Sequence, residues 1–339
     1  MMRLPWFSYR APRTATEAAR ILAGEGPTAM PIAGGTDLLP NMKRRQQVPA
    51  TLVSLRHVEG MKKLANGAGL TLGAGLTLTE VADTGIVREK YRALWQAAAQ
   101  VATVHLRNMG TLGGNLCLDT RCNYYNQNYE WRKAIDFCLK KDGEICWVAT
   151  ASKRCVAVSS TDCAPALIAL GAKVKLVSAD GEREVAAADL YQNDGIDYLT
   201  RRPDEIVTEV RLPHASGWKS SYWKLRRRGS FDFPVLGVAA AVRAAPDGTV
   251  EDARIVLGAV SSRPLVTQAG AALVGKQLTD DAIAEAAAKA ASRAKPLDNT
   301  DLDIYWRKQV VAEFVGYALK EIRGDDMRAT RLRYARHAL

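Results

Sequence analysis

The amino-acid sequence predicts an α+β fold with more than one domain. The chain has 339 residues, of which 47% are hydrophobic, and this is enough for a sizeable core and for two or three domains. Strand-like and helical patterns both recur along the chain. A plausible boundary lies at Ser216-Gly217, so we expect a large N-terminal part, 1–216, and a smaller part, 217–325, before a basic tail, 326–339.

The N-terminal part is predicted to mix short strands with helices. Thr14 and Glu17 have the spacing of a capping box and open a helix that continues to about Ala23. A long helix is predicted from Val87 to Thr103, because apolar residues recur there at helical spacing. The other predicted elements are strands at 28–33, 52–55, 70–78, 173–177 and 206–212, and helices at 36–45 and 164–170.

The C-terminal part is predicted to hold strands followed by two helices. Asp247-Gly248 separates two strand-like runs and is typical of a hairpin turn. The predicted strands are 222–225, 235–242 and 255–260, and the predicted helices are 279–294 and 303–322. We expect the basic tail to be solvated or packed on a partner.

The formal charge of +11 permits an anionic cofactor, nucleic acid or an acidic protein as a partner. The basic residues are scattered, and no zinc-finger or aromatic RNA-binding signature accompanies them, so we expect no nucleic-acid partner. No uncharged apolar run approaches about 18 residues, which predicts no membrane span. The start of the chain lacks a secretory apolar stretch, and we expect a cytoplasmic protein.

Two glycine-rich turns are the candidate ligand loops. The first, 31–38, joins a strand to a helix, and its paired glycines allow a close approach of the backbone to a phosphate. It is neither a Walker A loop nor a dinucleotide fingerprint. The second, 107–116, carries three glycines, a hydroxyl and an amide. Two such loops suit a pyrophosphate held from both sides by backbone N–H groups. The alternative is a pair of tight turns packed on a sheet, with Thr36 as a helix cap.

These loops are part of an ordered series of motifs. Residues 33–38, 111–116 and 160–167, followed by 222–228 and 253–258, resemble the FAD subunit of the xanthine dehydrogenase and carbon monoxide dehydrogenase class, the molybdenum hydroxylases. The resemblance extends from about Phe7 to about Ile322. Each motif is weak alone, and their order and spacing make the resemblance specific.

The resemblance implies the two-subdomain FAD-binding fold of the molybdenum hydroxylase flavoproteins (PCMH-like), with an α+β C-terminal domain. FAD would lie between the two N-terminal subdomains. The implied cofactor-binding residues are Pro31, Ile32, Ala33, Gly34, Gly35, Thr36, Asp37, Thr111, Gly114, Asn115, Asp162 and Lys224. The alternative for Asp162 is a helix N-cap, and for Lys224 an exposed strand lysine.

Six cysteines lie between residues 117 and 163 and nowhere else. Two of them belong to the flavin motifs, whereas Cys122, Cys138, Cys146 and Cys155 belong to an irregular insertion, 119–159. Four thiolates suit a structural zinc ion or a [4Fe–4S] cluster. The wide spacing lacks paired C-x-x-C knuckles and favours a cluster. Zinc ligands or ordinary buried thiols are the alternatives.

A flavin subunit with such an insertion is similar to those of the 4-hydroxybenzoyl-CoA reductases. This implies a [4Fe–4S] cluster on the four cysteines, and partner subunits with a molybdenum cofactor and [2Fe–2S] clusters in a dimer of heterotrimers. Electrons from ferredoxin would pass through this chain to remove the phenolic hydroxyl of 4-hydroxybenzoyl-CoA, giving benzoyl-CoA, in anaerobic aromatic degradation. No catalytic residue is expected here.

Two other functions remain open. The first is the flavin subunit of an oxidising hydroxylase of the xanthine or carbon monoxide dehydrogenase type, with a structural metal loop. The second is a basic nucleic-acid-binding module, against which the flavin loops and clustered thiols weigh. In the reductase, a basic surface on the insertion would steer an acidic ferredoxin; its residues are Arg121, Arg132, Lys133, Lys140, Lys141, Lys153 and Arg154.

Overall fold

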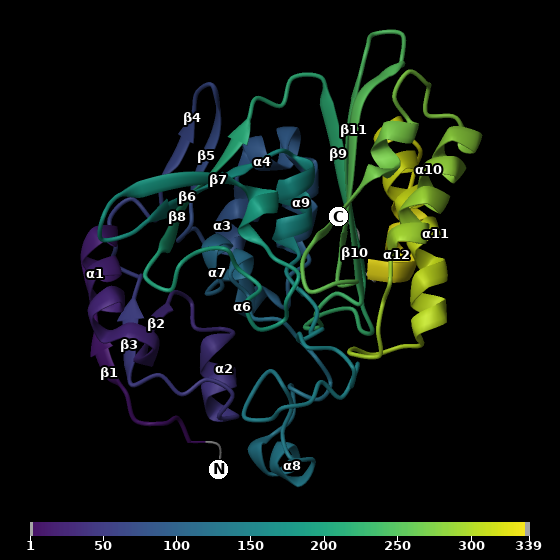
Figure 1. Cartoon of the computed structure of the whole chain (residues 1–339). Helices are drawn as coiled ribbons and strands as arrows, with labels where there is room; N and C mark the ends of the chain where they lie inside the picture. The colour runs from purple at the N-terminus through teal and green to yellow at the C-terminus, as the bar shows by residue number, and fades with distance from the viewer. Residues whose placement is uncertain (1–2, 336–339) are drawn as a thin grey trace.

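Three β-sheets organise the part of the chain that the computed structural model describes, residues 3–335 (Figure 1). The first is a parallel sheet with the order β1-β3-β2, and its strands are β1 (Ser8–Arg10), β2 (Ala29–Ile32) and β3 (Thr51–Ser54). Helix α1 (Ala15–Glu25) connects β1 to β2 and buries Ala18, Ala19 and Leu22. The Thr14 hydroxyl accepts a hydrogen bond from Glu17 N and caps α1, as predicted.

The second sheet is antiparallel and has the order β4-β5-β8-β6-β7. Its strands are β4 (Leu64–Asn66), β5 (Gly69–Gly73), β6 (Lys173–Val177), β7 (Glu182–Ala186) and β8 (Ile206–Pro213). The helices associated with the first two sheets are α2 (Leu38–Lys43), α3 (Leu78–Asp83), α4 (Gly85–Lys90), α5 (Arg92–Ala99), α6 (Val104–Arg107), α7 (Leu112–Leu116) and α9 (Cys163–Ala169). Both subdomains therefore mix helix and strand, as expected.

The long helix predicted over 87–103 is wrong, because the chain breaks there. Tyr91 leaves the helical conformation between α4 and α5, with φ −122° and ψ 53°, and its hydroxyl donates to Pro213 O at 2.8 Å. Ala102, at φ 44°, follows the end of α5. The apolar stripe continues across the break, so periodicity alone does not reveal it. The strand predicted over 70–78 also ends early, because Thr77 forms a capping box that starts α3.

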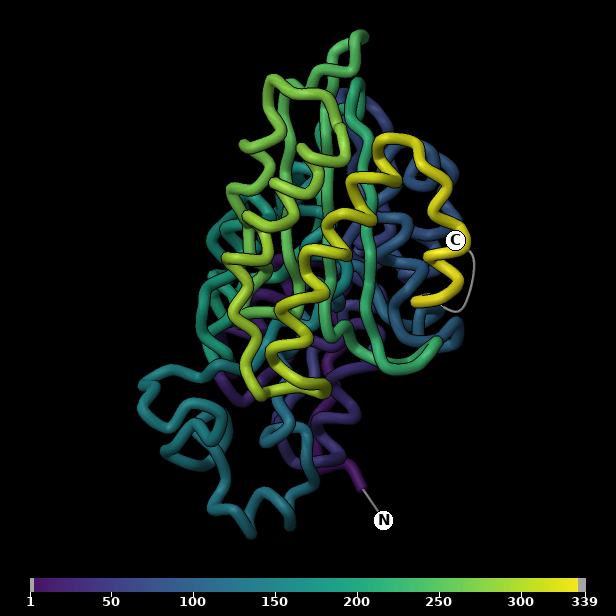
Figure 2. Tube along the Cα trace, turned by 90° about the vertical axis from the view of Figure 1, so that its right-hand side faces the viewer, coloured from purple at the N-terminus to yellow at the C-terminus, as the bar shows by residue number. Residues whose placement is uncertain are grey.

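The third sheet forms the C-terminal part, with the antiparallel order β12-β11-β10-β9. Its strands are β9 (Trp218–Leu225), β10 (Leu236–Ala244), β11 (Val250–Gly258) and β12 (Leu265–Thr267). Helices α10 (Asp280–Arg293) and α11 (Ile304–Arg323) cover one face, and α5 and α9 contact the other (Figures 1 and 2). The sheet thereby joins the C-terminal helices to the N-terminal part. Short 3₁₀ helices occupy Gly26–Thr28, Ala187–Leu190 and Gln268–Ala272.

The basic tail is partly packed against the C-terminal sheet. Helix α12 (Arg328–Ala335) places the Arg331 side chain in the interior, where it pairs with Glu321. Residues 336–339 of the predicted tail lie outside the described residues.

The insertion forms an irregular lobe beside α2 (Figures 1 and 2). It contains one short helix, α8 (Tyr129–Ala134), which was not predicted. Its two ends are paired, because Arg121 and Val158 exchange backbone hydrogen bonds of 2.8 Å in both directions. Asn299 also holds the lobe, since its side-chain amide donates to Val156 O at 2.6 Å.

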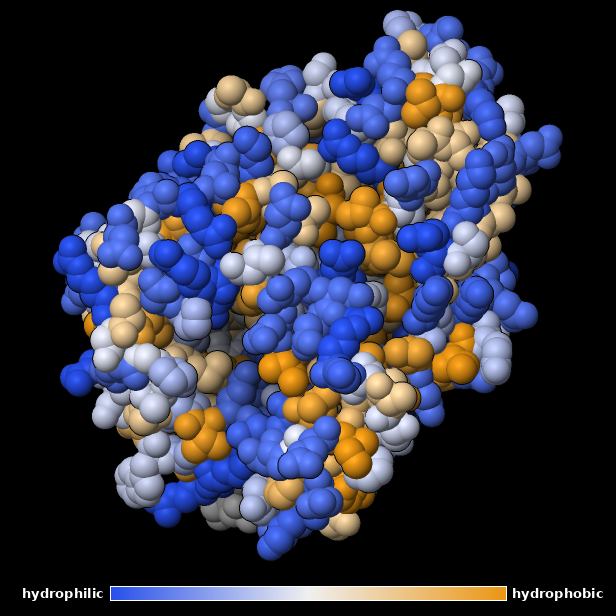
Figure 3. Space-filling view, in the orientation of Figure 1, coloured by the Kyte–Doolittle hydropathy of each residue, from blue (hydrophilic) through white to orange (hydrophobic). Residues whose placement is uncertain are grey.

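Within residues 3–335, none of the helices has the length and apolar character needed to cross a bilayer. The face drawn in Figure 3 is mostly hydrophilic, with scattered hydrophobic patches.

Candidate functional site

A cavity of about 340 Å³ lies between the first sheet and the second subdomain. Both glycine-rich loops contribute to its wall, together with Ser160, Asp162, Tyr198, Arg201, Ile206, Val207 and residues 231–233. Of the predicted cofactor-binding residues, the cavity wall contains Pro31, Ile32, Ala33, Gly34, Gly35, Thr36, Asp37, Thr111, Gly114, Asn115 and Asp162, but not Lys224. Its volume is in the range of small-molecule sites, which begins at about 300 Å³.

The first loop has backbone donors to spare. Within the described residues, the N–H groups of Gly34, Gly35 and Thr36 donate to no protein acceptor. A Cβ atom at Gly34 would lie 1.9 Å from Met109 O, so this loop packs directly on the residue before the second loop and tolerates no side chain. Three consecutive free N–H groups beside a cavity are suited to a phosphate. Asp37, rather than Thr36, occupies the N-cap position of α2.

The second loop uses its backbone donors internally. Gly114 N donates to Thr111 Oγ1 at 3.0 Å, and the N–H groups of Leu112 and Gly113 donate to carbonyls of residues 76 and 74. We expected the backbone N–H groups of both loops to face a pyrophosphate. This is wrong for the N–H groups of Leu112, Gly113 and Gly114, which are bonded within the protein. Residues 111–115 instead shape the wall, and short side chains keep it close to the cavity.

Asn115 is oriented by the motif that follows the insertion. Its Oδ1 accepts hydrogen bonds from Thr161 Oγ1 at 2.7 Å and from Cys163 N at 3.0 Å. These bonds leave the amide NH₂ group of Asn115 as a donor at the cavity wall. Motifs that are 46 residues apart in sequence thus meet through one side chain.

Asp162 and Lys224 form a buried ion pair. The Lys224 Nζ atom lies 2.9 Å from Asp162 Oδ2, and the two side chains are 1% and 3% exposed. Tyr222 donates to the other carboxylate oxygen at 2.7 Å, and Lys224 also donates to Gln100 O. Burial lowers the pKa of Lys224 from 10.5, although the Asp162 charge acts to raise it. Asp162 is the N-cap residue of α9, as its alternative held, although its side chain makes no cap hydrogen bond. Lys224 is buried, so the alternative of an exposed strand lysine is wrong.

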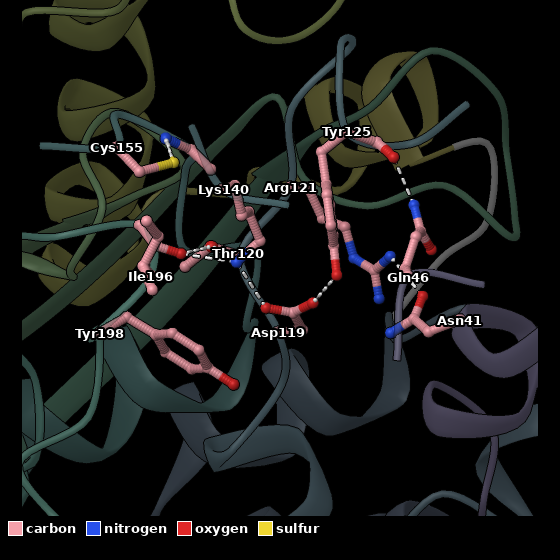
Figure 4. A network of polar contacts seen from close by, with 12 residues as sticks. Asn41, Gln46, Asp119, Thr120, Arg121, Tyr125, Lys140, Cys155, Ile196 and Tyr198 are labelled. Atoms are coloured by element: carbon pink, nitrogen blue, oxygen red, sulfur yellow. Dashed lines mark hydrogen bonds and ion pairs between the residues drawn. The ribbon is translucent and has the colours of Figure 1, made fainter. Parts of the chain in front are cut away.

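Arg121 connects the insertion to the first loop. Its guanidinium pairs with the Asp37 carboxylate. It also donates to Asn41 Oδ1 at 3.0 Å (Figure 4). Burial lowers the pKa of Arg121 to about 10. Its Nε atom is buried and has no hydrogen-bond partner within the described residues, and Arg121 is part of the cavity wall. Asp37 already compensates the charge of Arg121, and the Nε–H group is left as a donor for a ligand at the cavity wall.

The four insertion cysteines surround one small cavity. Cys122, Cys138, Cys146 and Cys155 are all buried, with relative exposures of 5–7%, and all six cysteines of the chain are free. Trp147 also contacts this cavity, whereas Trp131 packs on Tyr124 one layer further out. The structure thus brings together the thiols that the sequence spreads over 34 positions.

Burial raises the pKa of Cys122 to about 12 and that of Cys155 to about 11, so these thiols are protonated at neutral pH unless a metal displaces the protons. The space between the thiols is about 10 Å³, and side chains must move outward to admit a cluster. Within residues 3–335, no three histidine, cysteine or acidic side chains are grouped closely enough to hold a metal ion.

Comparison with known proteins identifies the family. Residues 5–215 match the family described as "FAD binding domain in molybdopterin dehydrogenase", and residues 220–322 match the "CO dehydrogenase flavoprotein C-terminal domain". The chain is a FAD-binding medium subunit of the molybdenum hydroxylase family. The predicted fold class and the general resemblance are confirmed.

Relatives of this flavoprotein come from several dehydrogenases. It is 34% identical to the aldehyde oxidoreductase FAD-binding subunit of Escherichia coli, over 76% of this chain and 82% of the relative. It is 28% identical to the carbon monoxide dehydrogenase medium chain of Afipia carboxidovorans, over 86% and 87%. The reconstituted CO dehydrogenase from Oligotropha carboxidovorans has a similar structure, with a TM-score of 0.78, 25% identity and coverage of 95% and 99%.

The expected basic surface on the insertion of this molybdenum hydroxylase subunit is partly wrong. Arg121, Arg132 and Lys140 are directed inward, where they contact the protein interior. The basic residues of the insertion that are at least partly exposed are Lys133, Lys141, Lys153 and Arg154. Charge alone did not distinguish the two groups, because a buried arginine or lysine with good partners has the same sequence signature as a solvated one.

Several residues of the flavin cavity wall were not predicted. Asp119 and Arg121 follow the second glycine loop closely in the chain, whereas Tyr198, Arg201, Phe231 and Phe233 are distant from both glycine motifs. No recognisable motif surrounds Tyr198 or Arg201 in the sequence. They line the cavity because the segment 198–207 passes beside it in the folded chain. Phe231 has φ 72°, which is unusual for a large side chain, and its N–H donates to Ala102 O at 2.9 Å.

Proposed function

We propose that this chain is the flavin-carrying electron-transfer subunit of a multi-subunit molybdenum hydroxylase, whose partner subunits hold the molybdenum cofactor and [2Fe–2S] clusters. The observation that carries the proposal is the cavity with free N–H groups at Gly34, Gly35 and Thr36 inside the matched FAD-binding domain. FAD, when bound, accepts and donates electrons singly or in pairs. The substrate is expected to bind to a partner subunit.

Each part of the cavity has a distinct task in this proposal. The free N–H groups of the first loop and the Arg121 guanidinium hold the pyrophosphate of FAD. Tyr222 and Lys224 fix the orientation of Asp162, which accepts hydrogen bonds from the ligand or its ordered water. The side-chain NH₂ group of Asn115 donates a hydrogen bond to the ligand in this proposal. Lys224 acts through Asp162 and is a positioning residue, and no residue of this chain is assigned as an acid or base.

An oxidising complex is the first candidate. The names of three relatives describe an aldehyde oxidoreductase, a carbon monoxide dehydrogenase and a nicotinate dehydrogenase. In this candidate, electrons leave the substrate at molybdenum and pass through this chain to an acceptor. The relatives favour this direction over the reductive dehydroxylation that the insertion suggested.

A reductase is the second candidate, and the insertion favours it. Four buried cysteines border one cavity and match the ligand type of a [4Fe–4S] cluster, although their side chains must move before the thiols can bind one. The relatives' names mention FAD only, so the cluster proposal depends on the cysteines of this chain. Aromatic side chains from Tyr124 and Trp147 border the cavity and would limit solvent access to a cluster. Ferredoxin would then be the electron donor, and 4-hydroxybenzoyl-CoA the substrate of the partner subunit.

Metal counts on the anaerobically purified complex distinguish the candidates. Cys155→Ser should remove about four irons per copy of this chain if the cysteines hold a cluster. A loss of one zinc ion would instead support a structural metal loop. The matched control is Cys163→Ala, a buried thiol that does not border the cysteine cavity and should keep all the metal. An unchanged metal content in Cys155→Ser would refute any metal on this loop, and a complex without flavin would refute the proposal as a whole.

The docking of a donor is tested by charge. The exposed basic residues of the insertion lie near the cysteine cavity, so the double variant Lys153→Glu, Arg154→Glu should slow reduction by an acidic ferredoxin and weaken the salt dependence of its rate. Arg293→Glu, an exposed position on α10, is the control with the same type of charge change. A rate that is independent of salt in the native complex would refute electrostatic steering.

A further inference from the structure

A buried ion pair lies in the wall between the two cavities. Asp119 borders the flavin cavity, and Lys140 borders the cysteine cavity. The Lys140 Nζ atom is 2.8 Å from Asp119 Oδ1, and the two side chains are only 7% and 5% exposed. Figure 4 places Lys140 between Cys155 and Asp119. The pair therefore has its positive end toward the thiols and its negative end toward the flavin site.

Hydrogen bonds hold both members of this pair in place. Lys140 Nζ also donates to Thr120 Oγ1 at 2.8 Å and to Gly195 O at 2.6 Å. Tyr125 donates its hydroxyl hydrogen to Asp119 Oδ2 at 2.9 Å. The ammonium group lies 4.8 Å from the centre of the Tyr125 ring, a cation–π distance. A charge that is buried, fixed and fully bonded acts on its surroundings with little screening by solvent.

The same network contacts Cys155 directly. Gly195, which accepts from Lys140, donates its N–H to Cys155 O at 2.9 Å. A Cβ atom at Gly195 would lie 2.6 Å from Cys155 Sγ, so the backbone that carries the Lys140 acceptor packs against the sulfur atom. The Lys140 ammonium group is buried and borders the cysteine cavity, so its charge stabilises negative charge there.

We propose that Lys140 is a positioning residue that raises the reduction potential of the cluster held by the insertion cysteines. The Asp119 carboxylate offsets the charge of Lys140 toward the flavin, so that the reduction potential of the flavin is raised less. The proposal rests on the cluster of the second candidate function. Reduction adds one negative charge to a centre ligated by thiolates, and a fixed ammonium group in a region of low dielectric stabilises the reduced form. The Asp119 carboxylate has the opposite sign and opposes the addition of an electron to the flavin.

The test is a potentiometric titration of the intact complex, followed by the electron paramagnetic resonance signal of the reduced cluster and by flavin absorbance. Lys140→Gln should shift the midpoint potential of the cluster to a lower value, and Lys140→Arg should keep it near that of the native complex. The control is Lys141→Gln, the neighbouring lysine, whose side chain is 34% exposed and pairs with Asp142 at the surface. This control removes the same charge and should shift the potential little, because solvent screens it.

A second variant covers the case in which Lys140→Gln does not assemble. Asp119→Asn removes the negative partner and keeps the lysine, so it should shift the cluster potential upward. The proposal is overturned if Lys140→Gln shifts the potential no more than Lys141→Gln does, or if Asp119→Asn leaves it unchanged or lower. A native complex with flavin but no cluster signal would overturn the cluster assignment itself, and this outcome is distinct from a cluster whose potential does not respond.

Discussion

Replacing Lys224 with methionine tests the arrangement behind the flavin cavity. Lys224→Met keeps most of the side-chain volume and leaves the Asp162 carboxylate buried, while the Tyr222 hydroxyl still donates to it at 2.7 Å. Because both members of the pair are almost completely buried, the free energy of unfolding should fall by about 3–5 kcal/mol. FAD affinity should fall as well, because Asp162 loses the contact that fixes its orientation at the cavity wall.

Urea unfolding of the flavin-loaded chain, alongside flavin release measured by fluorescence, gives both quantities. Lys219→Met is the control on the same strand, because Lys219 is exposed and its loss should change stability by about 0.5 kcal/mol or less. The double variant Lys224→Met, Asp162→Asn should be less destabilised than the sum of the single variants, since no unpaired charge remains. A loss below about 1 kcal/mol in Lys224→Met, or strict additivity, would refute the reasoning.

Two further predictions concern loop packing and pH. Gly34→Ala should abolish FAD binding, because its Cβ atom would lie 1.9 Å from Met109 O. The control Gly24→Ala, whose Cβ atom would have no neighbour within 4 Å, should retain flavin and raise the free energy of unfolding by up to about 1 kcal/mol. Flavin content after gel filtration checks the retention of flavin in both variants. Burial acts to raise the pKa of Glu321, but hydrogen bonds from Arg331 hold it below 4.5. Its folded-state pKa is thus depressed, so its contribution, about 1.5–3 kcal/mol, is present above pH 4.5 and is lost as pH falls through the folded pKa. In thermal unfolding, the Glu321→Gln variant should accordingly be less stable than the native chain near neutral pH, and its stability should depend less on pH below 4.5. Equal acid sensitivity of the two chains would contradict the assignment.

Much of the fold was predictable because its signals are local. Thr14 caps α1 as predicted, and the helices predicted over 279–294 and 303–322 are present as α10 and α11. The Asp247-Gly248 turn joins β10 to β11. The apolar stripe did not predict the break at Tyr91, whose hydroxyl contacts Pro213 O, 122 residues away in the chain. An apolar stripe of helical period is the same whether one helix or two carries it.

Some residues of the candidate site could also be predicted from the sequence, and others could not. The sequence by itself determined the glycine loops, the motif that contains Asp162 and the set of four insertion cysteines, since each is recognised by chemically distinctive residue types. Only the tertiary structure decided that Lys224 lies behind Asp162, that Arg121 is directed to Asp37, and that the Lys140–Asp119 pair separates the two cavities. The physical reason is that a lysine or arginine is compatible with solvent or with a buried partner, and the partner that decides between them is brought close only by the folding of distant segments.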